Sequence, residues 1–557
     1  MSRPAPRPPR APNRRDFFRR SGGAALAAAA LPLLPLRSGA AGAVFQHGVA
    51  SGDPLTDRVV LWTRVTPPDA ATAAVNVDFV VASDPALTQI VRTGRLRATA
   101  SRDFTVKFDT TGLEPARSYY YRFSALGATS PIGRTRTLPA GSTSRLRIAV
   151  ASCASHAAGW FNAYRRIAER PDLDLVLHLG DYLYEYGSNE FGSTRATEPP
   201  TEAITLADYR TRHAQYKRDA DLQELHRQHV IAPIWDDHEV ANDAWRNGAE
   251  NHDAATEGQW SARRNGALQA YYEWMPVREP ATRTRPQRTL RLGDLAEIVL
   301  LEERHSARSK QLPAPIPVPG IGQGFKATGR FLDPARTLLG AEQEAWLDAV
   351  LAASTARWKL IGQGVMLAQL KAVGRPNADG GSIFVNPDQW DGYPPARERL
   401  FDLIDPQPRL LNGPPANVVV LTGDIHSAWA SDIARDPNNP DVGGGGYDAA
   451  TGQGAIAVEF VATSITSPGI ADPDGTLAAL VQTQNPHVKH VDLQQHGYLL
   501  LDVTPERVVG EYWNVDTVAV PSGVQAFATA FEVRDGVPHL VPSAQTAPRA
   551  SPPPPAP

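Results

Sequence analysis

Four short apolar stretches of this sequence each end in side chains that can bind a metal ion or carry a proton. The stretches are Leu146–Ala151, Leu175–Leu179, Ile231–Trp235 and Val418–Leu421. The polar side chains that follow them are Cys153, Asp181, Tyr184, Asp236, Asp237, His238, Asp424 and His426. Open α/β sheets place their ligand crevice at the carboxyl ends of buried strands. The repetition therefore predicts one site built from four strand ends.

The types of donor in this set indicate a mixed metal site. Carboxylates suit hard cations such as Ca²⁺, whereas a thiolate and a phenolate indicate a transition metal. A phenolate ligand requires a strong Lewis acid, because the pKa of a free Tyr side chain is about 10. Iron(III) (Fe³⁺) beside calcium (Ca²⁺) is a combination that satisfies both kinds of donor.

Each segment also has a structural explanation when it is taken alone. Cys153 is the only cysteine, so the chain has no internal disulfide, and this thiol is either buried and inert or held by a metal. Asp236 and Glu239 fit the N-cap and first turn of a helix. That explanation leaves Asp237 and His238 without a role.

Two further observations extend the predicted site. Asp424 and His426 are two residues apart, so an extended segment presents them on the same side. Asn242 follows His238 at about one helical turn and is a further candidate for the same site.

Residues 1–43 have the pattern of an export signal. A basic region is followed by the apolar run Ala24–Leu36 and by the small residues 41–43. The apolar run is too short to span a bilayer comfortably. The residues 13–18, NRRDFF, resemble a twin-arginine signal. The translocase that recognises such a signal exports proteins that have already folded. We therefore expect the twin-arginine translocase as a partner and a periplasmic or extracellular location.

The charge of the remaining chain argues against some partners. Segment 1–43 holds eight Arg and one Asp, so its removal leaves 48 basic and 58 acidic residues. A net charge of about −10 does not fit a nucleic-acid-binding face. We also expect no transmembrane segment in this part of the chain.

The pattern of apolar residues divides the chain after the signal into two parts. Residues 44–140 contain short runs of β-forming residues between turns, which predict an N-terminal β-sandwich. From Arg145 to about residue 545, strands alternate with helices and then give way to a run of strands. Two packed sheets flanked by helices fit this order better than one doubly wound sheet. Residues 546–557 are rich in Pro and predict a disordered tail.

Some local predictions are specific enough to check. Residues 112–115 followed by Tyr119 are similar to the tyrosine corner of a fibronectin-type sandwich. Periodicity predicts helices over Phe161–Arg170, Gly258–Glu273 and Ala341–Ala353. Stretches without clear periodicity, which predict long loops, cover 187–205, 306–330, 371–389 and 435–454.

Eight motifs together resemble the PhoD-like metallophosphoesterases, the family of alkaline phosphatase D. The motifs are GVASGDP (48–54), RVVLWTR (58–64), ASC (151–153), HLGDYLYEY (178–186), WDDHEVAND (235–243), YYEWMPVR (271–278), LTGDIHSAW (421–429) and VEFVATSITSPG (458–469). The resemblance runs from about Phe45 to about Trp513. It implies an α+β fold with an N-terminal fibronectin/Ig-like β-sandwich and a four-layer αββα metallophosphatase core. It also implies an iron–calcium site that hydrolyses phosphate mono- and diesters.

The resemblance assigns roles residue by residue. It implies iron ligation by Cys153, Asp181 and Tyr184, with Asp181 bridging to a second metal. His238 falls at the position of the catalytic histidine. The other metal ligands that it implies are Asp237, Asp424 and His426.

One segment departs from the family pattern. An Asp-Thr-Arg-like element usually follows the strand at 296–301, whereas this chain has Leu301-Glu302-Glu303-Arg304. Arg304 remains a candidate for an additional ligand or phosphate contact, together with Asp236 and Asn242. The loops at 306–330 and 435–454 are also particular to this chain.

These observations predict a metal-dependent phosphoesterase in which a metal-bound hydroxide attacks the phosphate in line. His238 then protonates the leaving alkoxide or orients the phosphoryl group. One alternative is a phospholipase D-like phosphodiesterase that acts on phospholipid head groups. Another is an exported binding protein without catalysis. The sequence contains neither a Gly-x-Ser-x-Gly elbow nor a P-loop motif, which disfavours a serine hydrolase or a nucleotide-binding enzyme.

Overall fold

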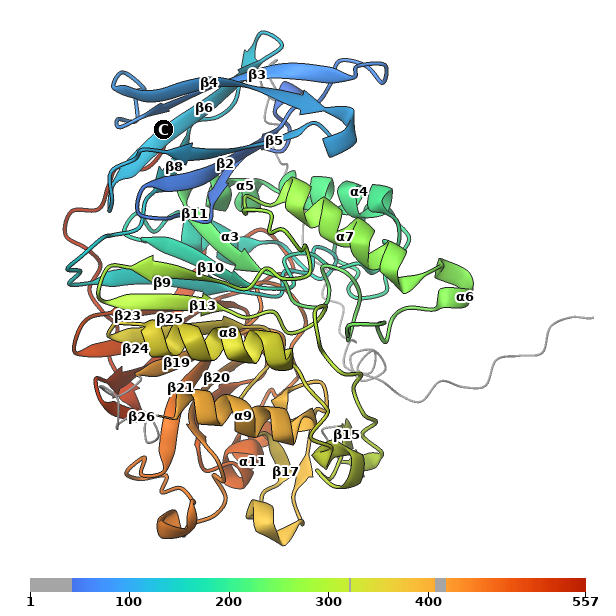
Figure 1. Ribbon diagram of the computed structural model, residues 1–557, viewed down its shortest axis with the longest axis vertical. Helices are drawn as coiled ribbons and strands as arrows, with labels where there is room; N and C mark the ends of the chain where they lie inside the picture. The colour runs from blue at the N-terminus through green and yellow to red at the C-terminus, as the bar shows by residue number, and fades with distance from the viewer. Residues whose placement is uncertain (1–42, 320–321, 406–416) are drawn as a thin grey trace, which may run out of the picture.

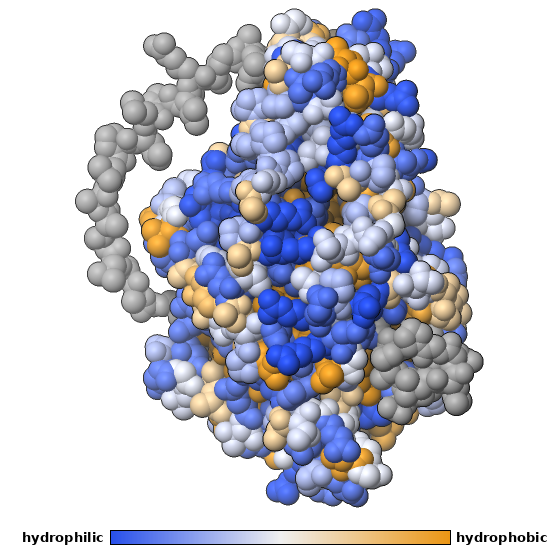
Figure 2. Space-filling model, turned by 90° about the vertical axis from the view of Figure 1, so that its left-hand side faces the viewer, coloured by the Kyte–Doolittle hydropathy of each residue, from blue (hydrophilic) through white to orange (hydrophobic). Residues whose placement is uncertain are grey.

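A computed structural model describes residues 43–319, 322–405 and 417–557. The predicted export signal therefore lies outside the described residues, apart from Ala43. Two large sheets pack face to face, and a smaller sheet from the N-terminal region stacks on one end of the molecule, at the top of Figure 1. The side of the molecule shown in Figure 2 is mostly hydrophilic, with apolar residues in small scattered patches.

The first large sheet has ten strands in the order β26-β25-β24-β23-β9-β10-β11-β1-β2-β5. Its centre is parallel across β9, β10 and β11, and β1 continues it in the same direction beside β11. The other neighbours pair in antiparallel fashion. The strands are β1 (Val49–Gly52), β2 (Arg58–Arg64), β5 (Thr105–Thr111), β9 (Leu146–Ala151), β10 (Leu175–Leu179), β11 (Val230–Ile234), β23 (Gly497–Val503), β24 (Arg507–Val515), β25 (Gln525–Arg534) and β26 (Val537–Ser543).

The second large sheet has seven strands in the order β12-β13-β16-β19-β21-β20-β22. Its four central strands, from β13 to β21, are parallel. The strands are β12 (Arg288–Leu292), β13 (Ala296–Leu300), β16 (Trp358–Gln363), β19 (Val418–Thr422), β20 (Ala428–Ala434), β21 (Ala455–Val461) and β22 (Val488–Asp492).

Alternation along the strands produces the layers of the core. On β9, Ile148 and Val150 face the other sheet, whereas Ala149 and Ala151 face a layer of helices. On β19, Val419 faces inward and Val420 faces the opposite helix layer. The order helix, sheet, sheet, helix is therefore the four-layer core that we predicted.

Helices cover the outer faces of both sheets. Those over the ten-stranded sheet are α3 (Asn162–Ala168), α4 (Leu206–Lys217), α5 (Ala220–Gln228) and α7 (Trp260–Trp274), and α6 (Ala254–Glu257) precedes α7. Those over the seven-stranded sheet are α8 (Gly340–Ala353), α9 (Pro394–Ile404) and α11 (Thr476–Gln484). Sequence signals fix several of their ends. Thr205 and Asp208 form a capping box for α4, and Pro394 is the first residue of α9.

The N-terminal region is less separate than predicted. Its smaller sheet contains β3 (Ala74–Ala82), β4 (Ile90–Thr99), β6 (Ser118–Ala125), β7 (Ala128–Thr129) and β8 (Gly133–Arg136). The facing strands β1, β2 and β5 belong to the ten-stranded sheet of the core. A boundary near residue 140 therefore does not isolate this region, because β1 hydrogen-bonds to β11. The amide of Glu114 donates to Tyr119 Oη over 2.8 Å, as a tyrosine corner requires. The fibronectin/Ig-like character stays a prediction.

The three predicted helices correspond to α3, α7 and α8 within a few residues. No helix begins at Glu239, because residues 238–240 form a turn. Two of the stretches in which we predicted long loops, 306–330 and 371–389, each contain a pair of short antiparallel strands. These are β14 (Ile316–Val318) with β15 (Gly322–Gly324), and β17 (Lys371–Val373) with β18 (Ile383–Phe384). The 3-10 turns are Ala100–Arg102, Gly329–Leu332, Asn377–Asp379, Trp390–Gly392 and Val442–Gly444. None of the helices in the described part of the chain combines the length and apolarity needed to cross a bilayer.

The prediction of a disordered tail over residues 546–557 is wrong. This segment returns to the N-terminal region, so that the C-terminus lies beside β6 and β8 (Figure 1). The carbonyl of Pro554 accepts from Tyr120 Oη over 2.6 Å, and that of Ala556 accepts from Gln228 Nε2 over 3.1 Å. Arg134 donates to the carbonyl of Pro553. Pro residues keep their carbonyl acceptors, and these bonds order a segment whose composition suggested disorder.

Deletion of residues 551–557 should lower the free energy of unfolding by ~1–3 kcal/mol, because Tyr120, Arg134 and Gln228 lose acceptors. Urea unfolding followed by circular dichroism measures this. Ser551→Ala is the control, since Ser551 is exposed. Equal stability of the deleted and full-length chains would show that the contacts contribute nothing.

Candidate metal centre

Four loops from both sheets converge at one edge of the core. Cys153, Asp181 and the segment 236–238 follow the adjacent parallel strands β9, β10 and β11. Asp424 and His426 follow β19 in the other sheet. Because parallel strands end at the same edge, these loops meet where the two sheets pack together.

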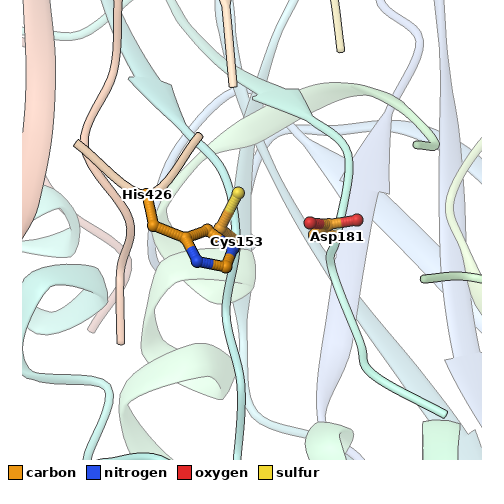
Figure 3. Close-up of side chains that lie close together, drawn as sticks. All are labelled: Cys153, Asp181 and His426. Atoms are coloured by element: carbon orange, nitrogen blue, oxygen red, sulfur yellow. The ribbon is translucent and has the colours of Figure 1, made fainter. Parts of the chain in front are cut away.

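The loops bring the predicted ligands into three overlapping groups. Each group offers ligand atoms that all lie within 4.8 Å of one another. Asp181 belongs to all three, and every member is buried. The groups are Cys153 with Asp181 and His426, Asp181 with Asp237 and His238, and Asp181 with Asp236, Asp237 and Asp424. Figure 3 shows the first of them, with the ring of His426 beside Cys153 and the carboxylate of Asp181 on the other side.

The backbone at these positions has an unusual conformation. Cys153, Asp181, Asp424 and His426 have φ angles of 59°, 53°, 59° and 58°, in the left-handed region that non-glycine residues rarely adopt. Gly180 has a φ of 96°, and a Cβ there would lie 2.5 Å from the Cβ of Asp236. Such strain concentrates at functional sites, where it directs side chains that an extended strand would point elsewhere.

Tyr184 lies at the centre of the first group. Its hydroxyl contacts Asp181 Oδ2 at 3.0 Å and His426 Nε2 at 2.9 Å, and it accepts from Ser467 Oγ at 2.7 Å. Its ring stacks on Phe191 with centroids 5.2 Å apart, and the imidazole of His238 lies 4.1 Å away on a tilted plane. Tyr184 therefore faces the group formed by Cys153, Asp181 and His426, which contains two of the iron ligands that the resemblance implied, Cys153 and Asp181.

Arg304 connects the carboxylates of the third group. Its Nη2 donates to Asp236 Oδ2 at 2.8 Å and to Asp424 Oδ1 at 3.2 Å. It lies 3.6 Å from Asp237 Oδ1, an oxygen that is buried and has no hydrogen-bond partner. Nη1 of Arg304 donates to Asp388 at 2.8 Å. The predicted candidate Arg304 is thus at the site, fully buried among carboxylates.

One guanidinium cannot balance so many buried acids. Burial raises the pKa of Asp181, as do the neighbouring carboxylates, although His238 opposes them. Burial likewise raises the pKa of Asp236 and that of the Cys153 thiol. A cation bound among these groups would favour their charged forms. The donors therefore fit metal ions: carboxylate oxygens for a hard cation, and thiol, phenol and imidazole for a transition metal.

His238 is held by a second buried acid. Its Nδ1 lies 2.8 Å from Glu185 Oε2, which leaves Nε2 for another partner. Burial by itself lowers the pKa of this imidazole, but Glu185, Asp237 and Asp181 together raise it above its ordinary value. The predicted catalytic histidine is therefore oriented by Glu185 and lies next to two of the predicted metal ligands.

Asn242, unlike Asp236, is not a member of the three groups of candidate metal ligands. Its side chain donates to Glu250 Oε2 at 3.0 Å, and its backbone amide donates to Glu185 Oε1 at 2.8 Å. It therefore lies in the network around Glu185, while Asp236 belongs to the carboxylate group itself.

Several supporting residues were not predicted from the sequence. Glu239 is buried and accepts from the backbone amides of Asp181, Tyr182 and Asp236, at 3.1, 2.7 and 2.9 Å. Burial raises its pKa to about 7. It ties the loop after β10 to the loop after β11. An acid that directly follows the Asp-Asp-His cluster was the only sequence signal for this role.

The Glu pair that departs from the family pattern also supports the site. Glu302 Oε1 accepts from the amides of Arg304 and His305 at 2.9 and 2.6 Å. Glu303 Oε2 accepts from the amides of Gly364 and Val365 at 2.9 and 3.1 Å. Both acids fix backbone turns around Arg304, so the departure preserves the position of the guanidinium.

Comparison with known proteins gives consistent matches. A model of the PhoD-like phosphatase family matches residues 148–512, and a model of the N-terminal domain of PhoD-like phosphatases matches residues 29–139. The chain is 37% identical to alkaline phosphatase D of Bacillus subtilis (strain 168) over 503 residues, 87% of this chain and 80% of that protein.

Solved structures agree with these matches. The chain is similar to a structure of PhoD with a TM-score of 0.80 and 34% identity, covering 93% of this chain and 95% of the other. It is also similar to a purple acid phosphatase from yellow lupin (Lupinus luteus) seeds, with a TM-score of 0.50 and 12% identity, covering 87% and 73%. The second likeness concerns the fold alone.

Glu239→Gln should lower metal affinity by ~10–100-fold although no predicted ligand changes, because its amide group would face backbone donors and misplace Asp181 and Asp236. Metal content after dialysis against a graded chelator measures this. The control is Glu342→Gln at an exposed position of α8. Unchanged metal retention in Glu239→Gln would exclude this positioning role.

Proposed function

The chain belongs to the PhoD-like phosphatase family, and we propose that it is an exported, metal-dependent phosphoesterase of the alkaline phosphatase D type. Its substrates are phosphate mono- and diesters. The observation that carries this proposal is the sharing of Asp181 by three overlapping buried groups of metal-binding side chains. A shared carboxylate is what a site with two adjacent cations requires, and paired cations are a recurrent solution for phosphate ester hydrolysis.

The chemistry of the donors supports two kinds of metal. Fe³⁺ would be held by Cys153, Asp181, Tyr184 and His426, because a phenolate needs a strong Lewis acid and a thiolate suits a transition metal. Ca²⁺ would be held on the carboxylate side, by Asp181 together with Asp237 and Asp424. When bound, the cations would neutralise charge on the phosphoryl group and lower the pKa of water.

The protein's own residues have separable roles in this proposal. His238 holds a proton at Nε2 for the leaving alkoxide, and Glu185 fixes the ring through Nδ1. Arg304 holds Asp236 and Asp424 in place through paired hydrogen bonds. Asp181 joins the two halves of the site, since its carboxylate contacts Tyr184 on one side and lies within 4.8 Å of Asp237 on the other.

Export by the twin-arginine translocase is part of the same proposal. It is supported by the sequence NRRDFF and the apolar run that follows it within residues 1–43. The location is accordingly the periplasm or the outside of the cell.

Metal-loaded protein should hydrolyse both p-nitrophenyl phosphate and bis(p-nitrophenyl) phosphate, and chelation should lower both rates by more than ~100-fold. Release of p-nitrophenol measures both reactions, and release of choline from phosphatidylcholine provides the comparison.

The outcomes separate the candidate functions. Cleavage of phosphatidylcholine alone would favour the phospholipase D-like alternative. Absence of all three activities in protein that contains its metals would favour an inert binding protein.

Asp181→Ala should remove iron and calcium together and lower kcat by more than ~10³-fold, because it breaks the bridge between the groups. His238→Ala should retain both metals and lower kcat by ~10²–10⁴-fold. Elemental analysis measures the metals, and visible absorption from an iron–tyrosinate pair should persist only in His238→Ala. Equal loss of metal in both variants would refute this division of roles.

A further inference from the structure

A cavity lined by cationic side chains lies next to the candidate metal centre. This cavity of about 540 Å³ opens between residues of the segments 245–247, 308–313 and 330–336. Its wall carries an unusual number of cationic side chains. These are Arg246, Arg308, Lys310, Arg330 and Arg336. Among the described residues that line the cavity, Asp333 is the only acidic one.

Three of the cations are available to a ligand. Arg246, Lys310 and Arg330 are exposed, and within the described ranges none of them has a carboxylate at ion-pair distance. The Nζ of Lys310 lies 4.8 Å from the centre of the Trp245 ring, which holds its charge at the wall by a cation–π contact. Like charges gathered in a concave wall raise the local potential for anions.

The other two cations are buried and retain an unused donor. Arg308 is 1% exposed and Arg336 is 8% exposed, and the Nε of each is buried without a hydrogen-bond partner. An unsatisfied buried guanidinium donor is costly to the folded protein. A bound oxyanion would offer oxygen atoms to such donors and offset the mutual repulsion of the five cations.

The cavity wall shares a carboxylate with the metal centre. Asp388 Oδ1 pairs with Arg308 at 2.5 Å, and Asp388 Oδ2 pairs with Arg304 at 2.8 Å. Gln311, which also lines the cavity, donates to Asp388 Oδ1 at 2.6 Å and to the carbonyl of Asp243 at 3.1 Å. One residue therefore separates a guanidinium of the cavity from the guanidinium that binds Asp236 and Asp424.

From this placement we propose that the cavity is a second anion subsite, which takes a distal phosphate group of a substrate whose scissile phosphate lies at the metal centre. The substrate class is thus a phosphate ester that carries at least two phosphate groups. Guanidinium groups bind phosphate and carboxylate oxygens in the same paired geometry, but a phosphate group carries nearly two negative charges near neutral pH, so a wall with five cations favours phosphate over a single carboxylate. The effect of this subsite on catalysis rests on the proposed function. Its binding of a distal phosphate does not.

The loop that supplies much of the wall lies outside the motifs that resemble the family. Residues 308–313 belong to the stretch 306–330, which lies outside the motifs shared with the family. The half-exposed ring of Trp245 follows the Asp-Asp-His segment and comes from a different loop. The subsite would therefore determine which phosphate esters this chain prefers, while the metal centre keeps the common chemistry.

The test compares thymidine 5′-(p-nitrophenyl phosphate) with the same ester carrying a 3′-phosphate. The second phosphate should raise kcat/KM by ~10-fold or more at low ionic strength, and added salt should reduce this ratio. In Lys310→Gln/Arg330→Gln the ratio should fall by at least ~5-fold. The matched control, Lys326→Gln/Arg95→Gln, changes the net charge equally at exposed positions outside the cavity and should keep the ratio.

A binding measurement separates this inference from the proposed function. Calorimetric titration of the purified full chain should show that thymidine 3′,5′-bisphosphate binds ~10-fold or more tightly than thymidine 5′-monophosphate, and that the cavity variant loses this difference. If neither ester is cleaved but the difference in binding persists, the proposed function fails and the subsite stands. Equal ratios in the cavity variant and its control, or no effect of the second phosphate in the wild type, would overturn the subsite.

Discussion

The burial of several carboxylates at one point is the constraint on which the rest of this structure depends. Asp181, Asp236, Asp237 and Asp424 lie with oxygen atoms within 4.8 Å of one another, and Arg304 is the guanidinium that contacts this group. Charges so close repel strongly in a medium of low dielectric constant. Cations bound among these acids would offset that repulsion. The strained backbone at the ends of the strands holds the acids in place against that repulsion.

Acids and amides behind the ligands make this arrangement rigid. Glu239 gathers three backbone amides from the loops after β10 and β11, and Glu185 holds the ring of His238. Asp388 is held between Arg304 and Arg308, and so couples the metal centre to the cationic cavity beside it. Each of these groups satisfies buried donors that would otherwise cost free energy. The same hydrogen bonds therefore stabilise the fold and fix the geometry of the site. The ion pairs Arg304–Asp388–Arg308 continue this network from the predicted metal ligands to the cavity.

Prediction from the sequence succeeded where one short segment contains its own signal. The central strands β9, β10 and β19 consist mainly of apolar residues because both of their faces are buried. The ends of β10 and β19 are marked by Gly and Asp, and Cys153 follows β9, so the candidate ligands could be named in advance. Prediction failed where partners distant in sequence decide the outcome. The segment 546–557 is ordered by contacts with Gln228 and Tyr120, and β1 joins the core sheet through β11. The local sequence contains no signal for either contact.

The sequence by itself determined the residue types of the centre, their positions after buried strands and the family to which the chain belongs. These follow from local patterns: apolar runs, a turn that needs Gly180, and the spacing of acids and imidazoles. Tertiary structure alone decided that Glu239 and Asp388 hold the loops and the guanidinium groups around the site in place, and that the cations of three separate loops line one cavity. The reason is physical, because these features depend on how two sheets and their loops pack, and packing joins residues that no periodicity in the sequence relates.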